Sequence, residues 1–158
     1  MKKWLYTALL LSVFSSAVVA DPFVGFKVTP LNTGNSTNGP ENISVNIGYA
    51  LDTWLADLSL VTEFSRSVSM GKTIQGDQLS LSADSMYVLW KTTRSMYVSA
   101  RLGMVNKEWV IAGNTDNSFD LYSGVSIGQV IGRTRLQVEY VSLGSDVNYL
   151  GIGLEFDF

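Results

Sequence analysis

The chain has 158 residues, with eleven basic and fourteen acidic side chains, and it contains neither cysteine nor histidine. A disulfide framework is therefore excluded, and the usual nitrogen and sulfur ligands of a zinc site are missing. The acidic balance argues against nucleic acid as a partner, because phosphate binding requires an excess of basic charge. The length suits one domain.

Residues 1–20 have the features of a cleavable signal peptide. Lys2 and Lys3 give a positive start, and residues 4–14 form an apolar stretch too short to cross a bilayer as a helix. Small residues then end at Ala20, so we expect cleavage before Asp21 and export by a Sec-type route. The mature domain, residues 21–158, would carry nine basic and fourteen acidic residues.

From residue 22 onward, apolar residues recur at every second position, which is the period of a β-strand with two unlike faces. Eight strands are predicted, at residues 23–29, 43–51, 55–65, 77–89, 96–106, 119–128, 133–142 and 147–158. Short turns at 52–53, 91–95 and 129–132 alternate with mostly longer links at 29–42, 66–76, 107–118 and 143–146. This alternation predicts an all-β, antiparallel, up-and-down barrel whose chain ends both lie on the short-turn side.

Most predicted strands separate an apolar face from a face of glycine, serine and charged residues. The fourth is less regular. Its apolar face is predicted to hold Leu79, Leu81, Ala83, Tyr87 and Leu89. This choice leaves Met86, Val88 and Trp90 among the polar residues, and a bulge near Asp84 would shift the register.

Alternation alone also fits a soluble, lipid-carrying barrel, which turns its apolar face inward. The glycines favour the opposite orientation, because small residues beside charged ones make a good narrow lumen. Aromatic residues near the short turns are predicted to form a girdle at the membrane interface, namely Phe23, Tyr49, Trp54, Trp90, Tyr97, Phe156 and Phe158. The apolar faces are therefore expected to contact lipid.

The final strand shows the strongest resemblance to a known family. Its apolar residues occupy every second position and end in phenylalanine, at Leu150, Ile152, Leu154, Phe156 and Phe158. Residues 21–158 resemble the OmpA/OmpX-type outer-membrane barrels, in which the barrel-assembly machinery recognises such a C-terminal strand. The resemblance implies a transmembrane eight-stranded barrel in a bacterial outer membrane, with those five residues as the assembly signal.

Charged residues on the opposite faces are expected to meet inside the barrel. They are Lys27, Asp57, Glu63, Asp84, Arg101, Arg135, Glu139, Glu155 and Asp157. Buried charges persist when they are paired, so we predict a structural ion-pair network that fills the lumen. The alternative is a gated ion path through a small porin-like channel.

No catalytic residue, cofactor or metal site is predicted, because the chain lacks a histidine base. The sequence favours a structural or surface-interaction role, in adhesion or envelope integrity, through extracellular loops. Expected partners are outer-membrane lipids, the assembly machinery and an unidentified surface ligand. Lipopolysaccharide is also expected, with Arg66 and Lys72 meeting its phosphates. A channel and a soluble lipid carrier stay open as alternatives.

Overall fold

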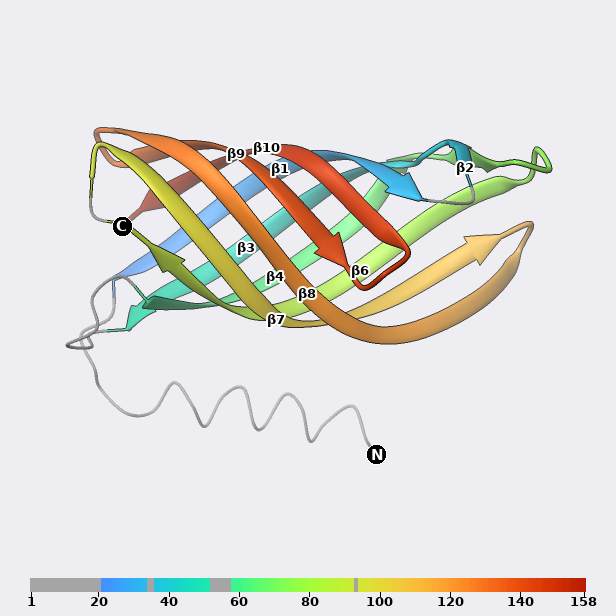
Figure 1. The fold of residues 1–158 in the computed structure, drawn as a ribbon, viewed down its shortest axis with the longest axis horizontal. Helices are drawn as coiled ribbons and strands as arrows, with labels where there is room; N and C mark the ends of the chain where they lie inside the picture. The colour runs from blue at the N-terminus through green and yellow to red at the C-terminus, as the bar shows by residue number, and fades with distance from the viewer. Residues whose placement is uncertain (1–20, 34–35, 52–57, 93) are drawn as a thin grey trace.

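The computed structural model describes residues 21–33, 36–51, 58–92 and 94–158 (Figure 1). The predicted signal peptide lies outside the described residues. In the described part of the chain, no helix is both long and apolar enough to cross a membrane.

Eight long strands form the wall of the molecule, and two short strands extend it at one end. The long strands are β1 (Pro22–Thr33), β3 (Glu41–Leu51), β4 (Leu58–Ser69), β6 (Gln78–Lys91), β7 (Met96–Ile111), β8 (Asn114–Ile131), β9 (Thr134–Leu143) and β10 (Val147–Asp157). Their order is β6-β4-β3-β1-β10-β9-β8-β7, and β6 also pairs with β7, which closes the sheet. All the pairs are antiparallel, so the predicted eight-stranded barrel is confirmed.

The two ends of the barrel differ. At the terminal end, where β1 begins and β10 ends, the Phe158 backbone N–H donates to the Pro22 carbonyl at 3.2 Å. The opposite, distal end carries the short strands β2 (Ser36–Asn38) and β5 (Gly71–Thr73) and the β7–β8 hairpin (Figure 1). The start of β1 and the end of β10 therefore lie together, in agreement with the up-and-down topology.

The β7–β8 connection is much shorter than the sequence pattern suggested. The expected link at residues 107–118 is wrong, since pairing continues to Ile111 opposite Asn114. Ala112 and Gly113 make the turn, with φ angles of 50° and 83°. Two successive left-handed residues form the compact turn that suits the twist of a hairpin. The two strands therefore continue as paired sheet to the distal end.

Large apolar side chains cover the outside of the wall. The apolar belt consists of Phe26, Val28, Ile43, Ile47, Leu51, Phe64, Met86, Val88, Trp90, Met96, Val98, Leu102, Met104, Phe119, Leu121, Val125, Ile127, Leu136, Val138, Tyr140, Leu150, Ile152, Leu154, Phe156 and Phe158. On β7 it runs from Met96 to Met104, which is about 27 Å of strand and roughly 20 Å of height at the usual tilt of about 40°. Exposed apolar surface of this extent is far beyond that of a water-soluble monomer.

The predicted faces of β6 are reversed in the structure. Leu79, Leu81, Ala83, Tyr87 and Leu89 lie buried inside the barrel. Met86, Val88 and Trp90 point outward into the apolar belt. The pairing of β6 with β4 and β7 is continuous, so the proposed bulge near Asp84 is absent. The distal half of the interior contains a group of packed apolar residues, to which β6 contributes Leu81 and Ala83.

The predicted aromatic girdle is correct only in part. Trp90, Phe156 and Phe158 are exposed on the outside, whereas Phe23 and Tyr97 are each only 2% exposed and lie inside. Tyr49 is half-buried, and Trp54 is outside the described residues. The distance of a residue from a turn indicates its position along the barrel axis. Its odd or even position in the strand decides whether its side chain points inward or outward.

Candidate functional site: the charged interior of the barrel

Four charged side chains from four strands meet in the middle of the barrel. Lys27 Nζ lies 2.5 Å from Glu63 Oε2 and 3.0 Å from Glu139 Oε1. Arg101 pairs with the other oxygen of Glu139. All four side chains are essentially inaccessible to solvent. This central cluster has two positive and two negative groups, so burial leaves no net charge.

Tyrosine side chains enclose the central cluster. The rings of Tyr87 and Tyr122 are stacked, with centroids 4.5 Å apart and an interplanar angle of 2°. Their hydroxyl groups donate to Glu63 Oε2 at 2.9 and 3.3 Å. Arg101 and Lys27 lie 5.6 and 5.9 Å from the centre of the Tyr87 ring. The aromatic faces thus add cation–π attraction where water is excluded.

A second charged group, the terminal cluster, lies nearer the chain ends. Lys91 Nζ is 2.7 Å from Glu155 Oε2, and Arg135 Nε is 3.7 Å from the same oxygen. Arg135 also pairs with Asp157. Lys91 and Arg135 lie 4.4 and 5.3 Å from the centre of the Phe23 ring. This cluster is also balanced, with two charges of each sign.

Gln137 connects the two clusters. Its Nε2 donates to Glu155 at 3.1 Å, and its Oε1 accepts from Arg101 at 3.4 Å. Tyr97 and Ser126 donate to the same oxygen at 3.3 and 3.2 Å. The polar contacts therefore form a continuous network across the interior.

Seven of the nine predicted lumen residues lie in these two clusters, namely Lys27, Glu63, Arg101, Arg135, Glu139, Glu155 and Asp157. Asp57 is outside the described residues. Asp84 was wrongly placed: it lies on the outer face, where its Oδ1 is 2.6 Å from Arg66 Nη1 and both side chains are about half exposed. The misplacement follows from the reversed faces of β6.

Sequence reasoning missed two interior lysines, because their positions were assigned to connections. Lys91 ends β6, and Lys107 lies within β7. Lys107 has no exposed side-chain surface; it donates to the Leu143 carbonyl at 2.8 Å and pairs with Asp120 at 3.0 Å and with Asp146. Extending the inward parity of Arg101 by six residues along β7 would have identified Lys107.

Four of the five residues of the predicted assembly signal lie on the outer face of β10, and the fifth, Phe158, directly follows this strand. Leu150, Ile152, Leu154, Phe156 and Phe158 are all exposed and belong to the apolar belt. The alternate residues Gly151, Gly153 and Glu155 are buried inside. β10 pairs with β1 and β9 along its length.

No family model and no curated protein sequence matches this chain. Solved structures do. Neisserial surface protein A (NspA) matches with a TM-score of 0.57 and 16% identity, over 87% of this chain and 97% of that one. The attachment invasion locus protein Ail of Yersinia pestis matches with a TM-score of 0.52 and 10% identity, over 88% and 97% of the two chains. Ail has also been solved in complex with the heparin analogue sucrose octasulfate.

A third similar structure is the outer membrane enzyme PagL, with a TM-score of 0.55 and 8% identity, over 85% of this chain and 99% of that one. At these identities the likeness concerns the fold. It agrees with the resemblance found in the sequence. The chain therefore has the fold of the small eight-stranded outer-membrane β-barrels.

Proposed function

We propose that this protein is an integral, non-conducting and non-enzymatic protein of a bacterial outer membrane, which acts through its distal end in surface interaction or envelope integrity. The observation that carries this proposal is the way side chains are divided between the outer and inner faces of the barrel wall. Large apolar residues face outward in the apolar belt, while the ion pairs face inward. A soluble lipid carrier requires the reverse arrangement.

The filled interior favours a closed barrel and argues against a channel. An eight-stranded barrel leaves only enough space for its own side chains. Here that space contains the two charge clusters, the stacked Tyr87 and Tyr122 rings and, in the distal half, apolar residues such as Leu81 and Val105. An ion entering the barrel would have to separate buried pairs, which costs several kcal/mol per unpaired charge.

A non-enzymatic role is supported by the residue types present. The chain has no histidine to act as a general base. The buried carboxylates Glu63, Glu139 and Glu155 are all engaged by cations. Similarity to PagL is therefore assigned to the shared barrel.

Lipopolysaccharide is the lipid partner that we propose for the outer surface. On β6 and β7 the belt ends at Met86 opposite Met104, and the next outward pair toward the distal end is Asp84 opposite Asn106. Arg66 lies beside Asp84 at this boundary, and Lys72 is exposed on β5. The test is the double variant Arg66→Ala/Lys72→Ala. If it binds lipopolysaccharide as well as the parent protein does, this assignment is wrong.

The membrane proposal is tested by fractionating cells that express the full chain. We expect the protein in the outer-membrane fraction, resistant to carbonate extraction, and migrating differently on gels with and without boiling. Planar-bilayer recordings of the folded protein should show no conductance steps. Release by carbonate would support the soluble carrier, and regular conductance steps would support the channel.

A further inference from the structure

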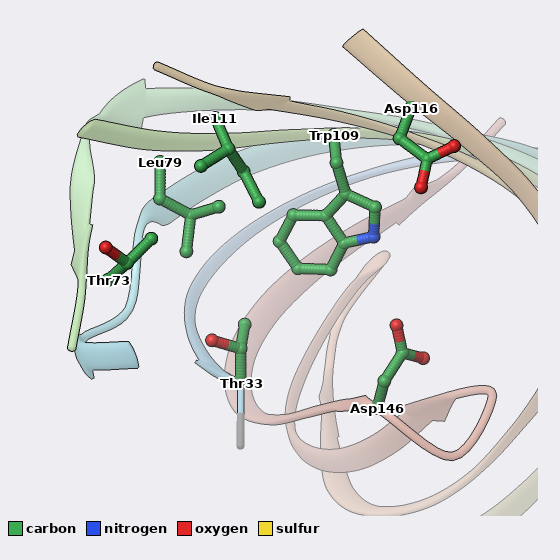
Figure 2. Close-up of a pocket in the computed structure, with 7 residues that line it drawn as sticks. All are labelled: Thr33, Thr73, Leu79, Trp109, Ile111, Asp116 and Asp146. Atoms are coloured by element: carbon green, nitrogen blue, oxygen red, sulfur yellow. The ribbon is translucent and has the colours of Figure 1, made fainter. Parts of the chain in front are cut away.

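The distal mouth of the barrel contains a cavity of about 220 Å³, and none of the residues that line it belongs to the central or the terminal cluster. Its walls come from β1, β5, β6, β7, β8 and the β9–β10 turn. Figure 2 shows the indole of Trp109 between the apolar side chains of Leu79 and Ile111 on one side and the carboxylates of Asp116 and Asp146 on the other. The cavity thus combines an apolar aromatic wall with negative charge.

Trp109 has a fixed support beneath it. Its side chain packs against the buried apolar residues of the interior, which in this half of the barrel include Leu31, Leu81, Leu143 and Val147. The indole is partly buried and leaves one part open to the cavity. A supported indole is the best aromatic surface for a cation, and its attraction rises when the cation is shielded from water.

The charge at this mouth is not balanced. Lys107 precedes Trp109 by two residues on the same face of β7. It donates to the Leu143 carbonyl and pairs with Asp120 and Asp146. An ammonium group has three hydrogens, so these three partners occupy it fully. Asp116 accepts only the backbone N–H of Asn117, at 2.9 Å, among the hydrogen bonds found for it in the described chain. Among these residues, Asp116, Asp120 and Asp146 outnumber the single ammonium group of Lys107, and Asp116 is not paired with it.

We propose that this cavity binds a small organic cation: an ammonium group carried on an apolar alkyl or aryl body. Leu79, Ile111 and Trp109 would contact the apolar body, while Asp116 and Asp146 would attract the ammonium group. A volume of about 220 Å³ equals that of about seven water molecules, which suits a ligand of this size.

The test uses the folded mature chain in a non-ionic maltoside detergent, since phosphocholine detergents carry a competing quaternary ammonium. Phenethylammonium is the probe, and 2-phenylethanol is its neutral analogue of matched shape. Binding is followed by the NMR signal of the Trp109 indole N–H, assigned by its loss in Trp109→Phe. We expect a saturable shift with phenethylammonium and at least fivefold weaker binding of 2-phenylethanol. Equal affinity for both would overturn the proposal.

Matched variants separate the site from the overall charge of the mouth. Asp116→Asn should weaken phenethylammonium binding at least threefold. Glu108→Gln removes one negative charge from the outer face of β7 and should leave the affinity unchanged. Equal losses in the two variants, or no saturable shift in the parent protein, would overturn the proposal. Unchanged spectra of the remaining residues would show that each variant is folded.

A variant of the aromatic wall gives an independent readout. Trp109→Leu keeps an apolar side chain but removes the indole, and binding is then followed by the methyl signals of Ile111. We expect the preference for the ammonium over the alcohol to fall at least twofold; an unchanged preference would overturn the role of Trp109. Because the assay needs only a folded barrel, its failure would leave the membrane proposal standing.

Discussion

Lys27 and Glu63 project toward each other from β1 and β4, which are not neighbours in the sheet, and their Nζ and Oε2 atoms are 2.5 Å apart. Lys27 also contacts Glu139 from β9 at 3.0 Å. One ammonium group therefore links three strands across the interior. Removing it would leave two buried carboxylates with Arg101 as the only cation of the central cluster.

We expect Lys27→Met to reduce the free energy of unfolding by about 3–5 kcal/mol, the usual cost of leaving a buried charge unpaired. The measurement is urea unfolding of the detergent-folded protein, followed by circular dichroism. Lys72→Met is the matched control, because Lys72 is exposed, and it should change stability by less than about 0.5 kcal/mol.

The double variant Lys27→Met/Glu63→Gln distinguishes charge from packing. It removes one charge of each sign and restores neutrality to the central cluster. We expect it to be more stable than Lys27→Met alone. A double variant that is less stable than either single variant would show that the hydrogen bonds, and not charge balance, dominate this region.

The reversed faces of β6 are tested by arginine substitutions on its outer face. Val88 lies in the apolar belt, whereas Ser82 lies distal to it, opposite Glu108 of β7. Val88→Arg should lower the free energy of unfolding in lipid vesicles by about 2–4 kcal/mol, as expected for arginine near the bilayer midplane. Ser82→Arg should be tolerated; a larger loss for Ser82→Arg would mean that the belt is misplaced.

Close contact between β6 and β7 predicts a strong effect of a single methyl group at Gly103. A Cβ atom there would lie 2.1 Å from the Met86 carbonyl oxygen and 2.5 Å from Tyr87 Cα, neither of which can move freely. We expect Gly103→Ala to cost about 1–3 kcal/mol of stability, as overpacking commonly does.

Gly153 provides the comparison for this measurement. A Cβ atom there would meet flexible side-chain atoms of Gln137 and Lys27 at 3.2 Å. Gly153→Ala should therefore have the smaller effect on urea unfolding. The reverse order of stabilities would contradict the register of β6 against β7.

The proposed assembly signal is tested by deleting Phe158. We expect less folded protein in the outer membrane of expressing cells, with little change in refolding into detergent, because recognition is lost while the barrel wall is retained. Phe119→Ala is the control, since it removes another exposed phenylalanine of the belt. Equal yields in cells for both variants would count against a C-terminal signal.

Strand parity allowed much of the barrel to be predicted from sequence. On β10 the alternation of Gly151, Ile152, Gly153 and Leu154 leaves one face for lipid and one for the interior, as the structure shows. Glycine and charge identified the inner face wherever the interior is polar. The same reasoning predicts that Lys27, Arg101 and Glu139 lie inside, where the structure has them.

The inner and outer faces of β6 could not be assigned in this way, because apolar residues occupy both of them. Leu79 and Leu81 belong to the apolar distal interior, while Val88 and Trp90 meet the belt. The outward residues Ser82 and Asp84 are polar because they lie distal to the belt. A rule that equates apolar residues with lipid contact fails where a barrel also has an apolar interior.

The wide spacing of the ion-pair partners along the chain has a consequence for membrane insertion. Lys27 and Glu63 are 36 residues apart, and Lys91 and Glu155 are 64 residues apart. An open sheet inserted into lipid would expose these charges before their partners arrived, at a high cost in energy. Intermediates with a partly formed wall are therefore disfavoured, and insertion and closure of this barrel should occur as one cooperative step.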